Sequence, residues 1–332
     1  MGSAEDFRMT AAEAKRLYLV QQVIERKLRQ RQAAELMRRS VRQVRRLVSR
    51  VRQAGPPGLV HRLRGRPSNR RHPAAVQPQV LRLYQARYRD FGPTLFVEQL
   101  RARHHLAVNR ETVRQWLRAA GLWTDRRARP HHRTWRARKA CVGELVQLDG
   151  SHHAWLERRG PTLVLMAYID DASNRVFARF YDYEGTRPAF DSFARYVRRY
   201  GLPQAVYVDR HTTYRSTAKP TVEDELANRL PQSQFERALA ALGVQVIPAF
   251  SPQAKGRVER LFGILQDRLV KELRLVGATT REQANRFLTT YLPRFNRWFQ
   301  RVPMQPTDLH RPPPPEAVLR RHTDEALEEL AE

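Results

Sequence analysis

Apolar residues recur at helical spacing in the first part of the chain. Within residues 11–28 four of them lie three or four positions apart, which predicts an amphipathic helix. These four are Leu17, Val20, Ile24 and Leu28. A short helix over residues 32–37 is expected next, and then a third helix that begins at Ser40, where Ser40 and Gln43 form an S-x-x-Q capping box.

The third helix has an apolar stripe and an opposite basic face. The stripe is Val41, Val44, Val48 and Val51, and the basic face is Arg42, Gln43, Arg45, Arg46, Arg50 and Arg52. Two short helices joined by a three-residue turn, the second of them basic, are typical of a helix-turn-helix whose second helix enters a major groove. The alternative is a three-helix bundle with a solvated basic face. Because so many arginines lack acidic partners within one turn, we predict DNA contacts for Arg42, Gln43, Arg45, Arg46 and Arg50.

A basic linker over residues 56–76 follows this first module, which spans residues 1–55. The linker contains the sequence Arg64-Gly65-Arg66-Pro67, which resembles an AT-hook. In such a hook an extended chain lays its arginines along a narrow minor groove. A flexible basic linker without groove contacts is the alternative. The position of the linker between two predicted DNA-binding modules favours minor-groove contacts by Arg64 and Arg66.

A second helical module is expected over residues 77–124. Asn109 is a favourable N-cap for its last helix, and Gly121 ends that helix. The predicted buried face of this helix is Val113, Trp116 and Leu117, and the predicted DNA-facing residues are Arg110, Arg114, Gln115 and Arg118. Two tandem helix-turn-helix modules imply a bipartite DNA site. A second basic linker, residues 125–143, comes next.

Beyond residue 144 the pattern changes from helical to strand-like. The expected strands are residues 145–150, 162–169, 175–183, 205–209 and 244–247, and the expected helices are residues 187–200, 235–242 and 254–273. The first strand is expected to end at the carboxylate of Asp149, and the fourth at Asp209. Three antiparallel strands followed by alternating helices and parallel strands are typical of a ribonuclease H-like mixed sheet.

The chain is therefore expected to be multidomain: all-α tandem helix-turn-helix modules, an α/β ribonuclease H-like core over residues 144–275, and a short C-terminal segment. That segment, residues 276–332, is expected to contain a helix over residues 281–300, then a Pro-rich stretch and an acidic tail.

The charge is concentrated in the N-terminal modules. The 332 residues carry a formal net charge of +28, of which +25 falls in residues 1–140 and +3 in the remainder. This distribution predicts a polyanionic partner for the N-terminal part. A hydrophobic fraction of 41% excludes a disordered polycation. No run of 18 apolar residues occurs, and Cys141 is the single cysteine, so we expect a soluble, cytoplasmic, nucleoid-associated protein without disulfides or a cysteine zinc site.

Four motifs carry a resemblance to a known family. They are Leu148-Asp149-Gly150-Ser151-His152-His153-Ala154-Trp155, Ile169-Asp170-Asp171-Ala172, Asp209-Arg210-His211-Thr212-Thr213-Tyr214-Arg215 and Ser251-Pro252-Gln253-Ala254-Lys255-Gly256-Arg257-Val258-Glu259-Arg260. With these motifs the chain resembles the DDE transposases of bacterial insertion sequences, which have an integrase catalytic core, and it is most similar to the ISNCY group. The resemblance covers roughly residues 10–312 and is most specific in the last motif.

The resemblance implies a catalytic and metal-binding triad of Asp149, Asp209 and Glu259. Carboxylates are the hard oxygen ligands that two Mg²⁺ ions require, and Mn²⁺ can substitute. The implied activity is binding of terminal inverted repeats, followed by DNA strand cleavage and strand transfer. The alternatives are a catalytically inactive DNA-binding regulator and a structure-selective nuclease of the same fold. We also predict DNA contacts for Arg210, Lys255, Arg257 and Arg260.

Other acidic residues near the motifs receive different roles. Asp170 and Asp171 lie in a turn, so we expect them to be structural, and Glu272 lies too far along its helix to join the triad. Asp209 and Glu259 are separated by 49 residues, and a surface excursion over residues 216–231 accounts for the length. The expected partners are double-stranded DNA, as transposon ends and as target, and further copies of the chain, which assemble on DNA as a dimer or higher oligomer.

Overall fold

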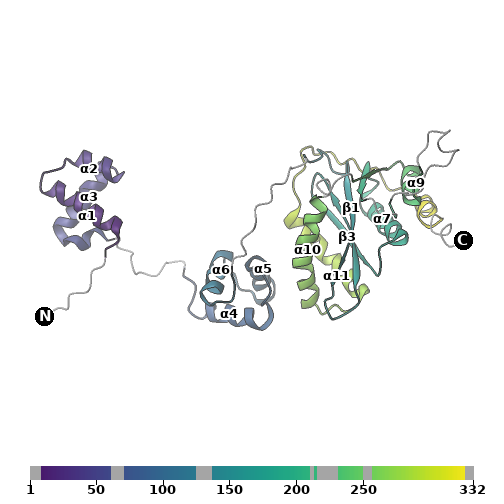
Figure 1. The fold of residues 1–332 in the computed structure, drawn as a ribbon, viewed down its shortest axis with the longest axis horizontal. Coiled ribbons are helices and arrows are strands. Elements are labelled where there is room, and N and C mark those ends of the chain that lie inside the picture. The colour runs from purple at the N-terminus through teal and green to yellow at the C-terminus, as the bar shows by residue number, and fades with distance from the viewer. Residues whose placement is uncertain are drawn as a thin grey trace. The chain divides into compact units, whose positions relative to one another are not determined.

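The structure is a computed structural model that describes residues 9–60, 71–124, 137–209, 213–214, 231–249 and 256–325. The chain divides into two compact units, Met1–Tyr88 and Arg89–Glu332. Figure 1 draws the helices and strands of both units. Within the described residues no helix is both long enough and apolar enough to cross a membrane.

Helices make up most of the described part of the first unit. They are α1 (Ala11–Ile24), α2 (Gln30–Met37), α3 (Val41–Ala54), the short 3-10 helix η1 (Pro56–Leu59) and α4 (Val76–Arg87). Apolar side chains from α1, α2, α3 and η1 form one core; they are Val20, Val23, Ala33, Ala34, Val44, Val48 and Leu59. The helical periodicity of the sequence predicted α1, α2 and α3. However, α1 ends at Ile24 and not at Leu28, and the predicted linker contains η1, whose Leu59 joins this core.

Local hydrogen bonds set the boundaries of the helix-turn-helix. The side chain of Ser40 accepts a hydrogen bond from the backbone N–H of Gln43 at 3.3 Å, so Ser40 is the predicted N-cap of α3. Arg38 ends α2 in the left-handed conformation, with φ of 51°. The turn between α2 and α3 is thus residues 38–40, three residues long as predicted.

The second unit begins with two further helices, α5 (Pro93–His104) and α6 (Arg110–Ala119). Asn109 caps α6 as predicted, because its side chain accepts from the N–H of Glu111 at 2.8 Å. Two of the three predicted core residues of α6, Val113 and Leu117, are fully buried. The third, Trp116, is half-buried, so that part of the prediction was wrong.

A five-stranded mixed sheet forms the centre of the second unit. Its strands are β1 (Val146–His153), β2 (Leu163–Asp170), β3 (Val176–Tyr181), β4 (Ala205–Val208) and β5 (Gln245–Pro248), and their order is β3-β2-β1-β4-β5. β1 pairs antiparallel with β2 and parallel with β4, β2 pairs antiparallel with β3, and β4 pairs parallel with β5. This is the predicted ribonuclease H-like sheet.

Helices cover both faces of the sheet (Figure 1). One core contains α7 (Thr186–Tyr200) and α9 (Gln234–Ala241), and the other contains α10 (Gly256–Leu275) and α11 (Arg281–Phe299). Successive residues of a strand face opposite sides. Val146 and Leu148 of β1 lie in the first core, so the odd-numbered residues of β1 face α10.

The first strand is longer than the sequence predicted. Asp149 was expected at its end, but β1 continues to His153, because β2 remains paired with it as far as His153 opposite Leu163. The pairing of β1 with β4 stops earlier, at Gln147 opposite Tyr207. Asp149 therefore lies within β1, at the level where its parallel neighbour ends.

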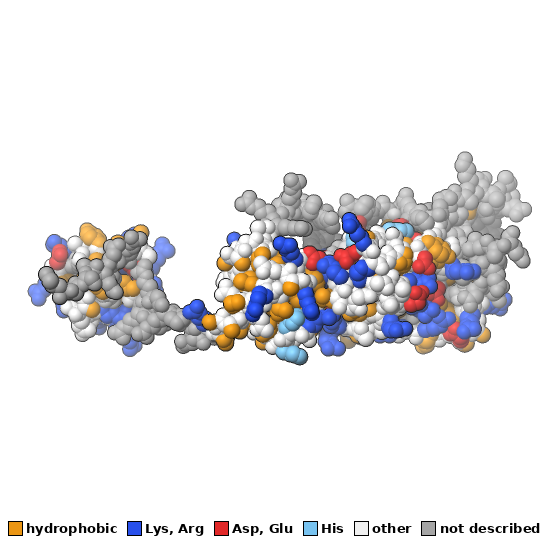
Figure 2. All heavy atoms as spheres, turned by 90° about the horizontal axis from the view of Figure 1, so that it is seen from below, with side chains coloured by type: hydrophobic (Ala, Val, Ile, Leu, Met, Phe, Trp, Pro, Cys, Tyr) orange, Lys and Arg blue, Asp and Glu red, His pale blue; other side chains and the backbone are white. Residues whose placement is uncertain are grey.

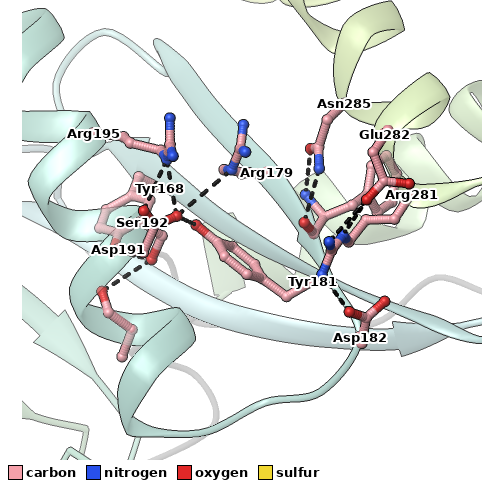
Figure 3. Close-up of polar contacts among 12 residues, drawn as sticks. Tyr168, Arg179, Tyr181, Asp182, Asp191, Ser192, Arg195, Arg281, Glu282 and Asn285 are labelled. Atoms are coloured by element: carbon pink, nitrogen blue, oxygen red, sulfur yellow. Dashed lines mark hydrogen bonds and ion pairs between the residues drawn. The ribbon is translucent and has the colours of Figure 1, made fainter. Parts of the chain in front are cut away.

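Side chains of α7 and α11 cover the outer strand β3 (Figure 3). Asn285 accepts from the N–H of Phe180 at 2.8 Å and donates to its carbonyl at 3.0 Å. On the α7 side, the Tyr181 hydroxyl donates to Asp191 at 2.6 Å, and Arg195 donates to the same carboxylate. Burial opposes ionisation of Asp191, but these bonds outweigh it and hold its pKa below the ordinary value. Because these side chains cover β3, the sheet has no freely exposed edge on this side.

The Pro-rich segment after α11 belongs to the core. The Leu309 N–H donates to the Val142 carbonyl at 2.8 Å, and Leu202 and Arg311 exchange backbone hydrogen bonds at 2.9 Å each. The chain then forms α12 (Glu316–Arg320), whose Leu319 is fully buried in the α7 core. We call residues 301–320 the strap. The sequence predicted only a Pro-rich tail here, because every partner of the strap is distant along the chain.

A glycine next to the strap provides a test of its contribution to stability. Gly143 has φ of 76°, and a Cβ there would lie 2.5 Å from His310 Nδ1 of the strap. Gly277 has a similar φ of 67° with open space around it. We expect Gly143→Ala to lower the free energy of unfolding by about 1–3 kcal/mol more than Gly277→Ala, because only Gly143→Ala adds overpacking to the backbone strain. Urea unfolding of both variants measures this difference. If both variants lose the same free energy of unfolding, the strap moves away from the added Cβ without destabilising the protein.

Candidate functional site

The register of β1 and β4 relates the position of Asp149 to that of Asp209, the residue after β4. The paired positions Val146 with Val206 and Gln147 with Tyr207 define the register of β1 and β4. If the same register is continued for two more residues along both strands, Asp149 stands level with Asp209. Both aspartates are half-buried. The strand register thus sets two predicted site residues that are distant in sequence at one level of the sheet.

The charges around Tyr214 support this proximity. Tyr214 is fully buried, and burial raises the pKa of its hydroxyl well above the usual value. The negative charges of Glu184, Asp209 and Asp149 raise that pKa further. The phenol is therefore close enough to all three carboxylates to sense their charge, and it stays protonated.

Glu259 lies on the helix that faces these strands. Its neighbour Val258 is fully buried against the sheet, and Glu259 itself is exposed on the first turn of α10. Gln266 lies seven residues after Glu259, which is two helical turns, and therefore on the same face of α10. Its side chain donates a hydrogen bond to Ser151 Oγ at 3.2 Å. Ser151 follows Asp149 by two positions on the same face of β1. The face of α10 that carries Glu259 therefore points toward the stretch of β1 that contains Asp149.

A fourth carboxylate, Glu184, was missed by the sequence analysis. A Cβ on Gly150 would lie 2.6 Å from its carboxyl group, so Glu184 packs directly on the backbone next to Asp149. Its Oε2 lies 2.9 Å from His152 Nε2. In the sequence, the only indication of this contact is Gly150, because a glycine within a strand often marks a close approach of another group to the backbone. Glu184 belongs to the loop before α7, which no motif marked.

The site offers the donor chemistry of a divalent-cation site. Asp149, Asp209 and Glu259 supply hard carboxylate oxygens, which suit Mg²⁺ or Mn²⁺ and do not suit a thiophilic metal. Within the described residues no three His, Cys, Asp or Glu side chains converge closely enough to hold a metal ion. The donor types fit such an ion, and joint coordination requires the three carboxylates to come closer together than they lie in this structure.

The predicted DNA-contact residues of α3 lie mostly on the surface. Arg42, Gln43, Arg45 and Arg46 are exposed, and Arg50 is half-buried. Arg45 also donates to Gln30 of α2 at 3.0 Å. In Figure 2 the charged side chains seen on this first helical module are mainly basic, whereas the larger unit carries both basic and acidic side chains. A basic helix exposed beside a three-residue turn can enter a major groove.

The other predicted contact residues have more varied surroundings. On α6, Arg110 and Arg118 are exposed, whereas Arg114 forms two hydrogen bonds with Glu111, at 2.7 and 2.8 Å. Gln115 also donates to Glu111, at 3.3 Å. On α10, Arg260 is exposed, but Arg257 forms an ion pair at 2.8 Å with the buried Asp171. Four predicted contacts lie outside the described residues: Arg64, Arg66, Arg210 and Lys255.

Comparisons with known proteins agree with this architecture. Residues 15–68 match a helix-turn-helix domain family. The chain is 39% identical over 305 residues to a protein named as transposase y4bF of Sinorhizobium fredii, an alignment that covers 92% of this chain and 66% of that protein. It is 28% identical over 326 residues to the transposase for insertion sequence IS1202 of Streptococcus pneumoniae, covering 86% and 68% of the two chains.

Solved structures with likeness to the chain include a viral intasome and an integrase catalytic core domain. A chain of the simian T-cell lymphotropic virus intasome, solved with the PP2A regulatory subunit B56 gamma, matches with a TM-score of 0.41 and 16% identity, over 71% of this chain and 79% of that chain. The HTLV-2 integrase catalytic core domain in complex with magnesium matches with a TM-score of 0.33 and 16% identity, over 44% and 83%.

The fold and the N-terminal domain define the class: a helix-turn-helix region joined to a core with a ribonuclease H-like mixed sheet. The chain is a relative of bacterial transposases. It spans about two thirds of the length of the curated relatives that it matches. Neither relative's name assigns the ISNCY group, which stays a prediction.

Proposed function

We propose that the protein is a DNA transposase that binds the ends of an insertion sequence, cleaves DNA strands there and joins them to target DNA. The relatives named as transposases support this activity, and one of them is named for an insertion sequence. The helix-turn-helix region supports recognition of the ends. The AT-hook-like linker and the second helical module extend the proposed recognition to a bipartite site.

The observation that carries the proposal is the arrangement of Asp149, Asp209 and Glu259. By the continued register of β1 and β4, Asp149 of β1 stands level with Asp209, the residue after β4, and Glu259 lies on the helix face directed at β1. We propose that all three hold two divalent cations, Mg²⁺ or Mn²⁺, which supply charge stabilisation for phosphodiester cleavage and joining. Tyr214, kept neutral, adds no charge to compete with the carboxylates.

Two rival functions remain distinguishable. A catalytically inactive DNA-binding regulator needs no triad, yet all three acids are retained in this chain. A structure-selective nuclease needs the triad but no sequence-reading helix-turn-helix. Joining two ends to one target requires two active sites in fixed relation, so we propose assembly of two or more copies on DNA.

Cleavage at the ends tests the proposal. Fragments of the DNA that flanks the gene are first selected for binding to the protein, and the bound fragments are then end-labelled. We expect strand cleavage at one fixed position per end that requires Mg²⁺ or Mn²⁺ and stops with a chelator. Binding without cleavage supports the regulator, and cleavage unrelated to the bound sequence supports the nuclease.

A further inference from the structure

Two buried aspartates, one at the end of β2 and one directly after it, have different surroundings. Asp170 is bound mainly by its own turn: Oδ1 accepts from the N–H of Ser173 at 2.7 Å and from its hydroxyl at 2.6 Å. Asp171 is fully buried and accepts from segments that are far apart in sequence. Its Oδ2 accepts from the Lys139 N–H at 2.8 Å, and its Oδ1 from Gln147 Nε2 at 3.0 Å and from Arg257 at 2.8 Å. Asp171 thus connects β1 to the beginning of α10.

Gln147 makes the second link between β1 and α10. Its side chain is fully buried, and its Oε1 accepts a hydrogen bond from the backbone N–H of Val258 at 3.2 Å. The first N–H groups of a helix have no acceptor within the helix, so this bond provides one from outside. Arg257 and Val258 are adjacent residues in the first turn of α10. We call Gln147, Asp171 and Arg257 the clamp.

Both ends of the clamp adjoin the proposed metal ligands. Gln147 precedes Asp149 by two residues and shares its face of β1. Val258, which the clamp holds, is the residue before Glu259. The hydrogen bond from Gln266 to Ser151 fixes α10 to β1 on the other side of Asp149. The stretch of β1 around Asp149 is therefore connected to α10 on both sides.

Attachment of α10 to the sheet does not by itself require these polar contacts. Val258, Leu261, Phe262, Leu265 and Leu269 already pack α10 onto the sheet. A buried ion pair is often no more stabilising than apolar residues of the same size, because both charges lose their hydration. Directional hydrogen bonds can, however, fix the rotation and the register of a helix turn, which non-directional apolar packing specifies less strictly.

We propose that Gln147, Asp171 and Arg257 are positioning residues that set the first turn of α10, and with it Glu259, relative to Asp149 and Asp209. This proposal rests on the transposase function proposed above. It also reassigns Arg257, predicted from the sequence to contact DNA, to a role inside the protein. Asp171 keeps the structural role that the sequence predicted, now with a defined purpose.

The double variant Asp171→Asn/Arg257→Met tests the clamp. It removes both charges together, so neither is left buried without a counter-charge, and the amide that replaces the carboxylate still offers an acceptor. We expect the rate of strand cleavage at saturating end DNA to fall about 10- to 100-fold, because small misplacement of a catalytic group has effects of this size. The KM for end DNA should not change. Mn²⁺ binding, measured by calorimetry without DNA, should weaken, and Arg257→Lys should retain more activity than Arg257→Met.

A matched control lies at the other end of the same helix. Glu272 of α10 is buried and forms an ion pair with Arg294 of α11. Glu272→Gln/Arg294→Met removes a comparable pair far from Glu259, so it should change stability while leaving the cleavage rate and Mn²⁺ affinity at wild-type values. Equal effects of the two double variants on rate and Mn²⁺ affinity would overturn the proposal, as would wild-type values in the clamp variant.

A third protein separates failure of the clamp from failure of the function. Glu259→Gln is assayed beside the two double variants. If Glu259→Gln cleaves like the wild type, the proposed triad is wrong and the clamp loses its purpose. If Glu259→Gln is inactive while the clamp variant is fully active, the triad stands and the positioning role is refuted.

Discussion

Asp149→Asn, Asp209→Asn and Glu259→Gln are each expected to reduce end cleavage and strand joining by about a thousandfold or more. An amide has nearly the size of the carboxylate but lacks its negative charge, so each variant loses an anionic ligand whose metal supplies several kcal/mol of transition-state stabilisation. DNA binding should remain, because the helix-turn-helix lies in the other unit of the chain. Cleavage rates in Mg²⁺ are measured together with DNA affinity for each purified variant.

An exposed acid of the same helix is the control for this series. Asp267 of α10 forms a surface ion pair with Lys271, and 60% of its side chain is exposed. Asp267→Asn should therefore retain wild-type cleavage. Wild-type activity in any one of the three triad variants would remove that residue from the proposed metal site.

Replacing Arg42 and Arg46 of α3 together by Ala is expected to weaken binding of end DNA by about a hundredfold. Both arginines are exposed on the helix that follows the three-residue turn. A lost arginine contact to a base costs about 1–3 kcal/mol of binding free energy. Each lost phosphate contact makes the plot of log binding constant against log salt concentration less steep by about one unit. Fluorescence anisotropy at several salt concentrations, with end DNA and with a shuffled sequence, measures both quantities.

The control for the α3 variant removes two positive charges from a helix of the other unit. Arg286 and Arg297 are exposed residues of α11 in the second unit. Arg286→Ala/Arg297→Ala should weaken binding to end and shuffled DNA slightly and equally. If the α3 variant shows the same small and sequence-independent loss, α3 contributes charge alone and is not the reading helix.

Local sequence signals predicted the helices and their caps well. Ser40 and Asn109 were recognisable as N-caps because their hydrogen bonds reach only two or three residues along the chain. The mixed sheet, with three antiparallel strands followed by parallel ones, also followed from the alternation of strands and helices. The end of β1 was predicted wrongly because Gly150 to His153 lacks an apolar pattern, and only pairing with β2 extends the strand through it.

Non-local contacts could not be predicted in the same way. Arg257 was expected at DNA because its neighbours in the motif are basic, whereas its counter-charge Asp171 lies 86 residues away. Glu184 reaches the site only because Gly150 leaves space for its carboxyl group. Leu319 joins the core at the end of a Pro-rich segment, for which composition alone predicted a tail.

Sequencing the junctions formed between end DNA and a target plasmid tests the transposase proposal most directly. The reaction contains wild-type protein, Mg²⁺, a bound end fragment and the plasmid, with Asp209→Asn protein in a parallel reaction. We predict covalent junctions in which the same terminal nucleotide of the fragment is joined to many plasmid positions, and none with Asp209→Asn. Cleaved ends without any junctions, or junctions formed equally by Asp209→Asn, would contradict the proposed strand transfer at this site.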